Sequence, residues 1–289
     1  MGKSIKRLRY LCCGLLWCIL NISTSNAIPT VIKSFFQKGY TGNSAVVLYN
    51  STEGLRRLNS TPDKKAFIAL SAHYSAQAHL LSCGIASSVI ILNTIYANLH
   101  KEPPLSEPGT FFYADKNLEE GHFIWTEENF FSGKVLCDLN KNVIYGRAKI
   151  KDKYVLGMSL DQLYTALIDQ GLSVEKFPVE STTTADIDKF RQLLVKVMLG
   201  PSHYIIVNYN LKVMGMIENS FGGHIAPLAA FDPVSDSVLI MDTWNVFGSW
   251  VWIKLEDLYK NMLVEDSKQR RGYLLIEANK AGEPLHCGK

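Results

Sequence analysis

The sequence predicts an α+β fold, because helical patterns occupy roughly its first two thirds and strand patterns the remainder. Before Pro201, apolar residues recur three or four positions apart in several segments, as they do on the buried face of a helix. After Pro201, short runs rich in Val, Ile, Tyr and Phe replace this spacing and are typical of strands. Helices followed by strands is the order of an α+β protein. No internal repeat or low-complexity linker divides the chain, so residues 28–289 are expected to form one domain.

The first 27 residues have the pattern of a secretory signal peptide. Basic residues near Met1 precede an apolar stretch from Tyr10 to Ile22, and Ser25-Asn26-Ala27 is a small-residue cleavage site. The apolar stretch is short for a membrane span, although an uncleaved anchor is the alternative. The expectation is an exported protein, periplasmic or secreted, with no stable membrane span after cleavage.

The composition is that of a globular protein, with 47% hydrophobic and 20% charged residues. The chain holds 30 basic and 27 acidic residues, and four of the basic ones lie in the leader, which leaves 26 against 27 and a net charge of −1. The positive excess therefore belongs to the leader. Nucleic acid is not an expected partner, because no basic patch remains in the mature chain.

Three cysteines remain in the mature chain, namely Cys83, Cys137 and Cys287. An odd number in an exported protein leaves at least one thiol unpaired. A bridge between Cys137 and Cys287 would leave Cys83 free, but the spacing does not fix this pairing. There is no CxxC pair and no Cys/His cluster with zinc spacing, so no metal-ligating residues are expected.

The strongest helical pattern begins at Cys83 and ends near His100, before Pro103-Pro104. Ser159-Leu-Asp-Gln162 is a capping box that opens a second helix, which Gly171 ends. Thr184 can cap a third helix, and its inward residues are Ile187, Phe190, Leu194 and Val197. A short helix is possible in Ser51 to Leu58, and the aromatic and charged stretch from Phe111 to Glu128 has the pattern of a surface excursion.

Five strands are expected in the last third of the chain, at Tyr204–Tyr209, His224–Phe231, Val238–Thr243, Trp250–Ile253 and Tyr273–Ile276. Asp232-Pro-Val-Ser-Asp236 has the chemistry of a turn, so the second and third strands are expected to form a hairpin. In that hairpin the start of one strand lies near the end of the other, which brings His224 close to Asp242.

Cys83 is the candidate nucleophile. A cysteine at a helix N-terminus lies near the positive end of the helix dipole and near unpaired amides, both of which favour the thiolate. Gln77, six residues earlier, can return its side-chain NH2 towards an oxyanion at the same place. Taken alone, this segment fits an inert buried thiol at the start of a core helix better, since free cysteines are often buried.

His224 and Asp242 complete a candidate catalytic set. An acceptor beside His224 fixes its tautomer and leaves the other ring nitrogen to take a proton from a thiol. A lone histidine in a strand is usually an ordinary core or surface residue. A cysteine at a helix start followed by Gly-Gly-His on a strand and by Asp one hairpin later is far more specific, since it has the Cys–His–acid order of papain-like enzymes.

The chain resembles the phytochelatin synthases, above all the short bacterial ones, from about Leu48 to Glu277. The resemblance rests chiefly on the motifs Gln77 to Ser87, Gly222-Gly-His-Ile-Ala-Pro-Leu-Ala229, Leu239-Ile-Met-Asp242 and Arg271-Gly-Tyr-Leu274, with weaker matches at Ser51-Thr-Glu-Gly54, Thr126 to Ser132 and Ile206-Val-Asn-Tyr209. It implies a papain-like fold in which an N-terminal helical lobe carries the cysteine and a C-terminal antiparallel sheet lobe carries the histidine and the aspartate.

The resemblance also implies a reaction, the cleavage of the Cys–Gly bond of glutathione through a cysteine thioester. Cys83 would be the nucleophile, His224 the general base and acid, Asp242 the group that orients it, and Gln77 an oxyanion donor. The substrate-binding residues implied are Asn208, Gly223 and Arg271, and a guanidinium suits the γ-glutamyl carboxylate. The alternative for Arg271 is a solvated surface cation beside Arg270.

Two departures from the family pattern concern the second, acceptor glutathione. The family usually has a basic-Tyr-x-Pro-Pro run after the aspartate, where this chain has Trp244 to Trp250. After the Asn-Tyr pair the family often has an arginine, where this chain has Leu211 followed by Lys212. The expectation is therefore an enzyme that mainly hydrolyses glutathione to γ-glutamylcysteine and glycine, with phytochelatins as a further product.

No cofactor is expected, although heavy-metal ions such as Cd²⁺ or Zn²⁺ fit the resemblance as part of a metal-thiolate substrate or as activators. Glutathione is the expected small-molecule partner, and a homodimer is left open. The competing hypotheses are a secreted papain-like peptidase or amidase, and a non-catalytic thiol- or metal-binding protein on the same fold.

Overall fold

The computed structural model describes residues 46–104, 124–147, 149–150, 153–154, 157–198, 202–214, 223–244, 250–263 and 270–288. All of them belong to the unit Tyr40–Lys289. The expected signal peptide, Met1–Ala27, lies outside the described residues. Within the described part of the chain, no helix is both long and apolar enough to cross a bilayer.

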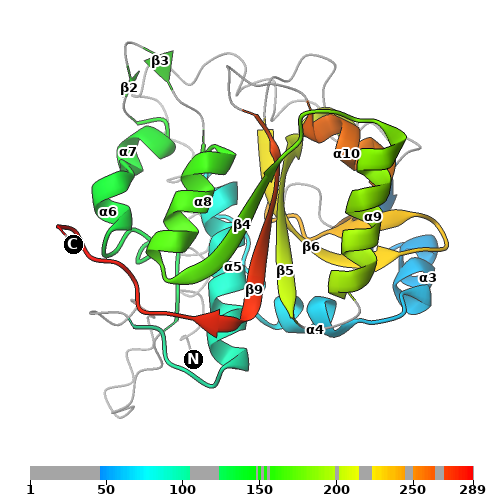
Figure 1. Ribbon diagram of the computed structural model, residues 1–289, viewed down its shortest axis with the longest axis horizontal. Helices are drawn as coiled ribbons and strands as arrows, with labels where there is room; N and C mark the ends of the chain where they lie inside the picture. The colour runs from blue at the N-terminus through cyan, green and yellow to red at the C-terminus, as the bar shows by residue number, and fades with distance from the viewer. Residues whose placement is uncertain are drawn as a thin grey trace, which may run out of the picture. The chain divides into compact units, whose positions relative to one another are not determined.

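A seven-stranded antiparallel sheet forms the centre of the fold (Figure 1). Its strands lie in the order β1-β8-β7-β6-β5-β9-β4. Their bounds are β1 Val46–Leu48, β4 Leu172–Pro178, β5 His203–Asn210, β6 Gly223–Asp232, β7 Ser237–Ile240, β8 Val251–Lys254 and β9 Gly272–Ala281. A separate two-stranded sheet pairs β2 Lys149–Ile150 with β3 Lys153–Tyr154. The seven-stranded antiparallel sheet, together with the helices described next, confirms the predicted α+β class.

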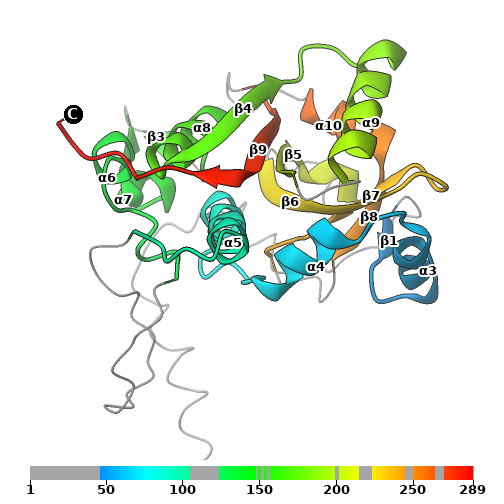
Figure 2. The same cartoon turned by 60° about the horizontal axis from the view of Figure 1, so that its bottom comes forward.

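The helices pack on both faces of the sheet. Their bounds are α3 Thr52–Ser60, α4 Lys65–Ala72, α5 Cys83–Asn98, α6 Val135–Asp138, α7 Lys141–Ile144, α8 Leu160–Asp169, α9 Thr184–Met198, α10 Leu255–Met262 and the 3-10 helix η1 Leu211–Met214. In Figure 2, α4 and α5 lie below the sheet and α9 and α10 above it. Strands β5, β6 and β7 are consequently buried at nearly every position, rather than at alternate ones.

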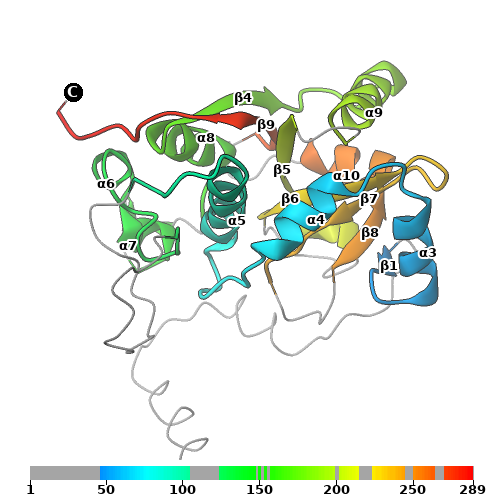
Figure 3. The same ribbon diagram turned by 90° about the horizontal axis from the view of Figure 1, so that it is seen from below.

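Helix α5 is the most deeply buried helix that the structure describes, and it begins at Cys83 as the sequence predicts. Every residue from Cys83 to Leu92 is buried, because α5 packs against β6 and β9 of the sheet and also against α4 and α8 (Figure 3). Its interior hydroxyls are satisfied, since Ser87 Oγ donates to the Ile225 carbonyl at 3.1 Å and Ser88 Oγ to the Gly84 carbonyl at 2.8 Å. The hydrogen bond from Ser87 joins the first half of α5 to β6, the strand that carries His224.

The predicted hairpin is present as β6 and β7. Asp232 organises its turn by accepting hydrogen bonds from the backbone amides of Val234 and Ser235 and from the Ser235 hydroxyl. An aspartate that binds backbone amides two and three residues ahead stabilises a turn in this way. Asp236, with a φ of 47°, supplies the left-handed residue that closes it.

A β-bulge at Ala229 sets which residues of the hairpin share a face. The register shifts after Leu228, which pairs with Ile240. Paired residues lie on the same face and side chains alternate along a strand, so His224 and Asp242 fall on the same face. Without the extra residue, Ile240 would oppose Ala229 and Asp242 would turn to the other face.

The expectation of a surface excursion from Phe111 to Glu128 is wrong at its C-terminal end, and residues 111–123 lie outside the described part of the chain. Trp125 is buried, with 1% of its surface exposed. Its backbone is fastened to α5, because the Trp125 amide donates to Asn93 Oδ1 at 2.8 Å and Asn93 Nδ2 donates to the Trp125 carbonyl at 2.9 Å. This paired contact fixes the turn that follows on the side of α5.

Cys137 and Cys287 form a disulfide, which joins α6 to the C-terminal segment. The same segment is held by backbone hydrogen bonds from Lys134 N to the Leu285 carbonyl at 2.7 Å and from Leu285 N to the Asp169 carbonyl at 2.8 Å. The sequence left this pairing open. The bridge leaves Cys83 as the free cysteine of the described residues.

Loss of the bridge should lower stability without removing activity. Because it closes a loop of 150 residues, Cys287→Ser is expected to lower the free energy of unfolding by about 2–5 kcal/mol. Cys137→Ser and the double variant should lower it by the same amount, since each breaks the same bond. Denaturant titration measures this, and a double variant much less stable than either single one would contradict a simple bridge.

Candidate active site

Cys83 is the first residue of α5, and only 8% of its surface is exposed. Ser82 occupies the N-cap position, yet its side chain makes no capping hydrogen bond. The amides of the first turn are thus left uncapped by any side chain, next to the thiol. No group of three or more His, Cys, Asp or Glu placed to hold a metal occurs among the described residues.

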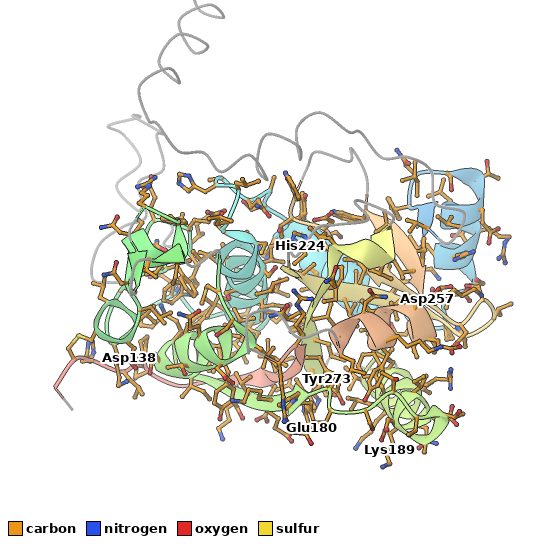
Figure 4. The ribbon with its side chains drawn as sticks, turned by 90° about the horizontal axis from the view of Figure 1, so that it is seen from above. Asp138, Glu180, Lys189, His224, Asp257 and Tyr273 are labelled. Atoms are coloured by element: carbon orange, nitrogen blue, oxygen red, sulfur yellow. A yellow bond between two sulfur atoms is a disulfide. The ribbon has the colours of Figure 1, made fainter. Side chains whose placement is uncertain are left out.

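His224, which is labelled in Figure 4, forms a buried pair with Asp242 beside Cys83. His224 Nε2 lies 2.7 Å from Asp242 Oδ1, and the exposed fractions of the two residues are 3% and 2%. His224 also shares a hydrogen bond with the Cys83 side chain. Since Nε2 is used by Asp242, Nδ1 is the ring nitrogen left for the thiol.

The surroundings favour the imidazolium form of His224. Burial lowers the pKa of His224, but the charge and hydrogen bond of Asp242, together with the Cys83 side chain, outweigh burial and raise this pKa to about 10. The imidazole is therefore protonated at neutral pH, as a proton donor to a leaving amine has to be.

Asp242 is held by its neighbours as well as by His224. Its Oδ1 also accepts the Trp244 amide at 2.8 Å, and the Tyr74 hydroxyl donates to its backbone carbonyl at 2.9 Å. The Trp244 ring lies 6.4 Å from the His224 ring. These contacts fix the carboxylate in the position from which it orients His224.

Tyr209 is a residue at the site that the sequence reasoning did not single out for chemistry. It pairs with His224 across β5 and β6, and its ring meets the imidazole edge to face at 5.8 Å. Burial, Asp242 and Cys83 raise the pKa of Tyr209 well above its usual range, so its hydroxyl stays neutral. The signal available in the sequence was its place beside Asn208, which the resemblance already marked.

The side-chain amide of Gln77, expected as an oxyanion donor, is engaged within its own loop. Its Nε2 donates to the His79 carbonyl at 2.8 Å and to the Leu80 carbonyl at 3.0 Å, so both amide hydrogens are used within the loop that leads to Cys83. Its Oε1 accepts the Thr243 hydroxyl at 3.0 Å, and its backbone amide donates to the Thr243 carbonyl at 2.9 Å. Gln77 thus joins the nucleophile loop to the residue after Asp242.

The structure brings Asn208, Gly223 and Arg271 together. A Cβ placed on Gly223 would lie 3.1 Å from Arg271 Nη2 and 3.4 Å from Asn208 Oδ1. Gly223 is exposed, whereas Asn208 and Arg271 are 6% and 2% exposed, so this cluster reaches solvent at Gly223. The alternative of a solvated surface cation is excluded for Arg271.

Gly272 explains the position of Arg271. A Cβ at Gly272 would lie 2.1 Å from the Phe177 carbonyl oxygen of β4. Any side chain at this position would clash, so only glycine lets the backbones of β9 and β4 approach this closely. One residue before Gly272, the Arg271 carbonyl accepts the Val179 amide at 3.0 Å. The end of β4 and the residue after it therefore fix the backbone at Arg271 and Gly272.

Arg270 and Leu211 lie next to motifs of the resemblance. Arg270 is exposed and pairs with Glu180, which lies away from His224 in Figure 4. Leu211 is a core residue with 2% of its surface exposed. The side chain of Lys212 lies outside what the structure describes.

Comparisons with known proteins found relatives that share one name. Glutathione gamma-glutamylcysteinyltransferase 2 of Arabidopsis thaliana is 24% identical over 233 residues, 79% of this chain and 44% of the relative. Glutathione gamma-glutamylcysteinyltransferase 1 of the same plant is also 24% identical, over 41% of its length. The glutathione gamma-glutamylcysteinyltransferase of Schizosaccharomyces pombe is 27% identical over 101 residues, 34% of this chain and 22% of the relative.

The chain thus spans less than half the length of the Arabidopsis relatives. A family model described as phytochelatin synthase matches residues 41–273, which include Cys83, His224 and Asp242. That range covers most of the chain and all of the seven-stranded sheet except β9, of which it includes only Gly272 and Tyr273. The chain belongs to the phytochelatin synthase family.

Proposed function

We propose that this protein is an enzyme that cleaves the Cys–Gly bond of glutathione through a thioester on Cys83. The observation that carries the proposal is the Cys83–His224–Asp242 set, which meets at the buried start of α5 in a chain of the phytochelatin synthase family. The names of the plant and fungal relatives, glutathione gamma-glutamylcysteinyltransferase, supply the substrate.

In the first half of the reaction, Cys83 Sγ attacks the carbonyl carbon of the Cys–Gly amide. The developing oxyanion is stabilised by the Cys83 amide at the positive end of α5. His224 Nδ1–H then protonates the glycine nitrogen, the C–N bond breaks, and a γ-glutamylcysteinyl thioester remains. Gln77 can add a second donor only by giving up one of its two carbonyl acceptors.

In the second half, neutral His224 takes a proton from the incoming nucleophile. Water gives γ-glutamylcysteine, and the amino group of a second glutathione gives a two-unit phytochelatin. In both cases the C–S bond breaks and Cys83 leaves as the thiolate, restoring the pair with His224. Heavy-metal ions such as Cd²⁺ or Zn²⁺ would enter as part of a metal-thiolate acceptor or as activators.

The cluster of Asn208, Gly223 and Arg271 has the groups needed to hold the γ-glutamyl end. Among the described residues, Asn208 Oδ1 is buried and accepts no hydrogen bond. A buried acceptor of this kind suits the α-ammonium of the γ-glutamyl group. The Arg271 guanidinium suits the neighbouring α-carboxylate, which it can bind with two parallel hydrogen bonds.

Arg271→Met is expected to raise the KM for glutathione. Loss of a charge-assisted hydrogen bond costs on the order of 1.5–3 kcal/mol, or about tenfold to a hundredfold in affinity. Arg271→Lys should recover only part of this loss, because an ammonium cannot bind a carboxylate with two parallel bonds. Initial rates of glycine release measure the effect.

Arg270→Met is the matched control, because Arg270 is adjacent in sequence but exposed and paired with Glu180. It is expected to leave KM within about twofold, since exposed ion pairs contribute little. Equal increases in KM for both variants would refute the assignment of Arg271 to the γ-glutamyl group.

Hydrolysis is expected to dominate over transfer. A second glutathione competes with water for the thioester only if cations hold its two carboxylates close to Cys83. Where the family pattern has basic residues, this chain has Leu211 and Trp244. Leu211 is a core residue, and the ring of Trp244 lies beside the His224 ring. Arg270 is engaged by Glu180.

The product profile tests the proposal. At millimolar glutathione, the main products should be γ-glutamylcysteine and glycine, with two-unit phytochelatin minor even when Cd²⁺ or Zn²⁺ is supplied. Glycine should equal the sum of γ-glutamylcysteine and phytochelatin, because each thioester formed releases one glycine. Mass spectrometry of a timed reaction measures all three. Phytochelatin in excess of γ-glutamylcysteine would show that an acceptor site exists and that transfer is the main reaction.

We also propose that the fold is papain-like, with Cys83 carried by a helical lobe and His224 and Asp242 by a lobe built on the antiparallel sheet. The start of the nucleophile helix against the β6–β7 hairpin supports this. Export from the cytoplasm is a further proposal, supported by the leader pattern and by the Cys137–Cys287 disulfide, since such bonds persist mainly in oxidising compartments.

A further inference from the structure

Thr243 is a buried residue that the proposed reaction does not use. It directly follows Asp242, and 0% of its surface is exposed. Its hydroxyl donates to Gln77 Oε1 at 3.0 Å, and its backbone carbonyl accepts the Gln77 amide at 2.9 Å. Thr243 therefore holds Gln77 through both the side chain and the backbone.

A third hydrogen bond strengthens this junction. The Tyr74 hydroxyl, which lies in the same segment as Gln77, donates to the Asp242 carbonyl at 2.9 Å. The segment that leads into Cys83 is thus fastened, at its start, to two consecutive residues, Asp242 and Thr243. Asp242 orients His224, so the nucleophile loop and the acid of the catalytic set share one junction.

The side-chain amide of Gln77 is held at both ends. Its Oε1 accepts the Thr243 hydroxyl, and its Nε2 donates to the His79 and Leu80 carbonyls at 2.8 and 3.0 Å. If the amide were turned over, Oε1 would face two carbonyl oxygens, which cannot donate to it. The nitrogen is therefore directed at the loop that ends at Cys83.

The Thr243 bond becomes more important as the reaction proceeds. Nε2 can donate to an oxyanion only by giving up one loop carbonyl, and an anion is a stronger acceptor than a neutral carbonyl. After that exchange, the Thr243 hydroxyl is one of two protein contacts that keep the amide in place. A contact that contributes more in the transition state than in the ground state raises kcat. A donor on Oε1 also strengthens the N–H groups of the same amide.

We propose that Thr243 is a positioning residue for the reaction: its buried hydroxyl holds Oε1 of Gln77, so that the amide nitrogen can pass from a loop carbonyl to the oxyanion formed at Cys83. This inference rests on the proposed function of Cys83. It assigns Thr243 no contact with the substrate, and its effect passes through Gln77.

Thr243→Val, which keeps the shape of the side chain and removes the hydroxyl, should lower kcat for glycine release with little change in KM. The loss should be about threefold to tenfold, as for one neutral hydrogen bond. Thr243→Ala should lose as much, and Thr243→Ser, which keeps the hydroxyl, should keep most of kcat. Thermal unfolding shows whether each variant is folded.

Thr61→Val is the matched control. Thr61 is also buried, with 3% of its surface exposed, and its hydroxyl donates to the Arg57 carbonyl at 3.0 Å, at the end of α3. Its loss should leave kcat unchanged. An unchanged kcat in folded Thr243→Val, or an equal loss in Thr61→Val, would overturn the proposal.

A double-mutant cycle tests whether the effect passes through Gln77. Gln77→Ala alone should lower kcat on the order of a hundredfold to a thousandfold, as the loss of an oxyanion donor does. In that variant, Thr243→Val should cause no further loss, because the hydroxyl has no amide left to hold. Losses that multiply in the double variant would show that Thr243 acts independently of Gln77.

Alkylation of Cys83 by iodoacetamide gives a readout without an oxyanion. Its rate as a function of pH should be the same in Thr243→Val as in the unchanged protein, since the thiol and its pair with His224 are not altered. A shifted profile would mean that Thr243 acts on the thiol or on the position of its loop, which contradicts the proposal.

The outcomes separate this inference from the proposed function. If the unchanged protein releases no glycine from glutathione, the proposed function fails and the role of Thr243 fails with it. If it releases glycine but the losses in Thr243→Val and Gln77→Ala are independent, the proposed function stands and the role of Thr243 does not.

Discussion

Replacing Cys83 with alanine is expected to abolish glycine release from glutathione while leaving the fold intact. Without the thiol no thioester forms, and loss of a catalytic nucleophile lowers kcat by a factor on the order of 10⁴ or more. Cys83→Ser should be as inactive, because a serine hydroxyl at this position remains protonated and is a poor nucleophile. Assays of released glycine, with unfolding curves for both variants, measure this.

Cys137→Ser and Cys287→Ser are the matched controls, because they remove the other described cysteines, which form the bridge to the C-terminal segment. Both are expected to keep most of the activity at temperatures where they remain folded. Substantial turnover in Cys83→Ala would refute the mechanism, and complete loss in folded Cys137→Ser would point to a second essential thiol.

Replacing Asp242 with asparagine should have the next largest effect. The raised pKa of His224, about 10, depends on the negative charge of Asp242. If that pKa falls to 6.5 or below, only about a tenth of the imidazole is protonated at a pH of about 7.5, so turnover should drop at least about tenfold. The alkaline limb of the pH–rate profile should move to lower pH in the same variant.

The stability of the folded protein should show the same linkage. A group whose pKa is raised on folding contributes stability that is fully present below its unfolded pKa, near 6.5, and is lost as the pH rises through about 10. Asp242→Asn should flatten this dependence. His224→Ala should be at least as inactive, whereas Asp257→Asn, on α10 away from His224 in Figure 4, should change neither profile. An unchanged alkaline limb in Asp242→Asn would mean that another group orients His224.

Much of the site could be predicted from local sequence patterns. The start of α5 at Cys83 and the β6–β7 hairpin follow from periodicity and turn chemistry, which act over a few residues. Their combination brought Cys83, His224 and Asp242 together. A hairpin alone does not place His224 and Asp242 on the same face, however. The bulge at Ala229 does, and the sequence pattern does not reveal it.

The edge strands of the sheet could not be found in the same way. Strand β1, Val46–Leu48, pairs with β8, and strand β4, Leu172–Pro178, pairs with β9, so each partner lies far along the chain. Both strands lie before Pro201, in the part of the sequence where the pattern of apolar residues predicts helices. Their stability comes from this distant pairing rather than from a local pattern.

The use of side-chain hydrogen bonds was the least predictable feature. Gln77 could be placed near Cys83 from its spacing, but not its two donations to the carbonyls of its own loop. The link between Glu127 and Ala78 joins segments 49 residues apart and leaves no pattern in the sequence. Such contacts depend on the conformations that the loops adopt in the folded protein, which the local sequence does not determine.

The measurement that tests the central claim most directly is the mass of the intact protein during turnover of glutathione. A rapid acid quench should trap a species heavier by one γ-glutamylcysteinyl group, and peptide mapping should place that group on Cys83. The species should be absent in Cys83→Ala. A peptide that lacks the γ-glutamyl linkage should give less of the corresponding acyl adduct on Cys83. Glycine release with no such adduct, or with the adduct on a residue other than Cys83, would contradict a thioester mechanism at the start of α5.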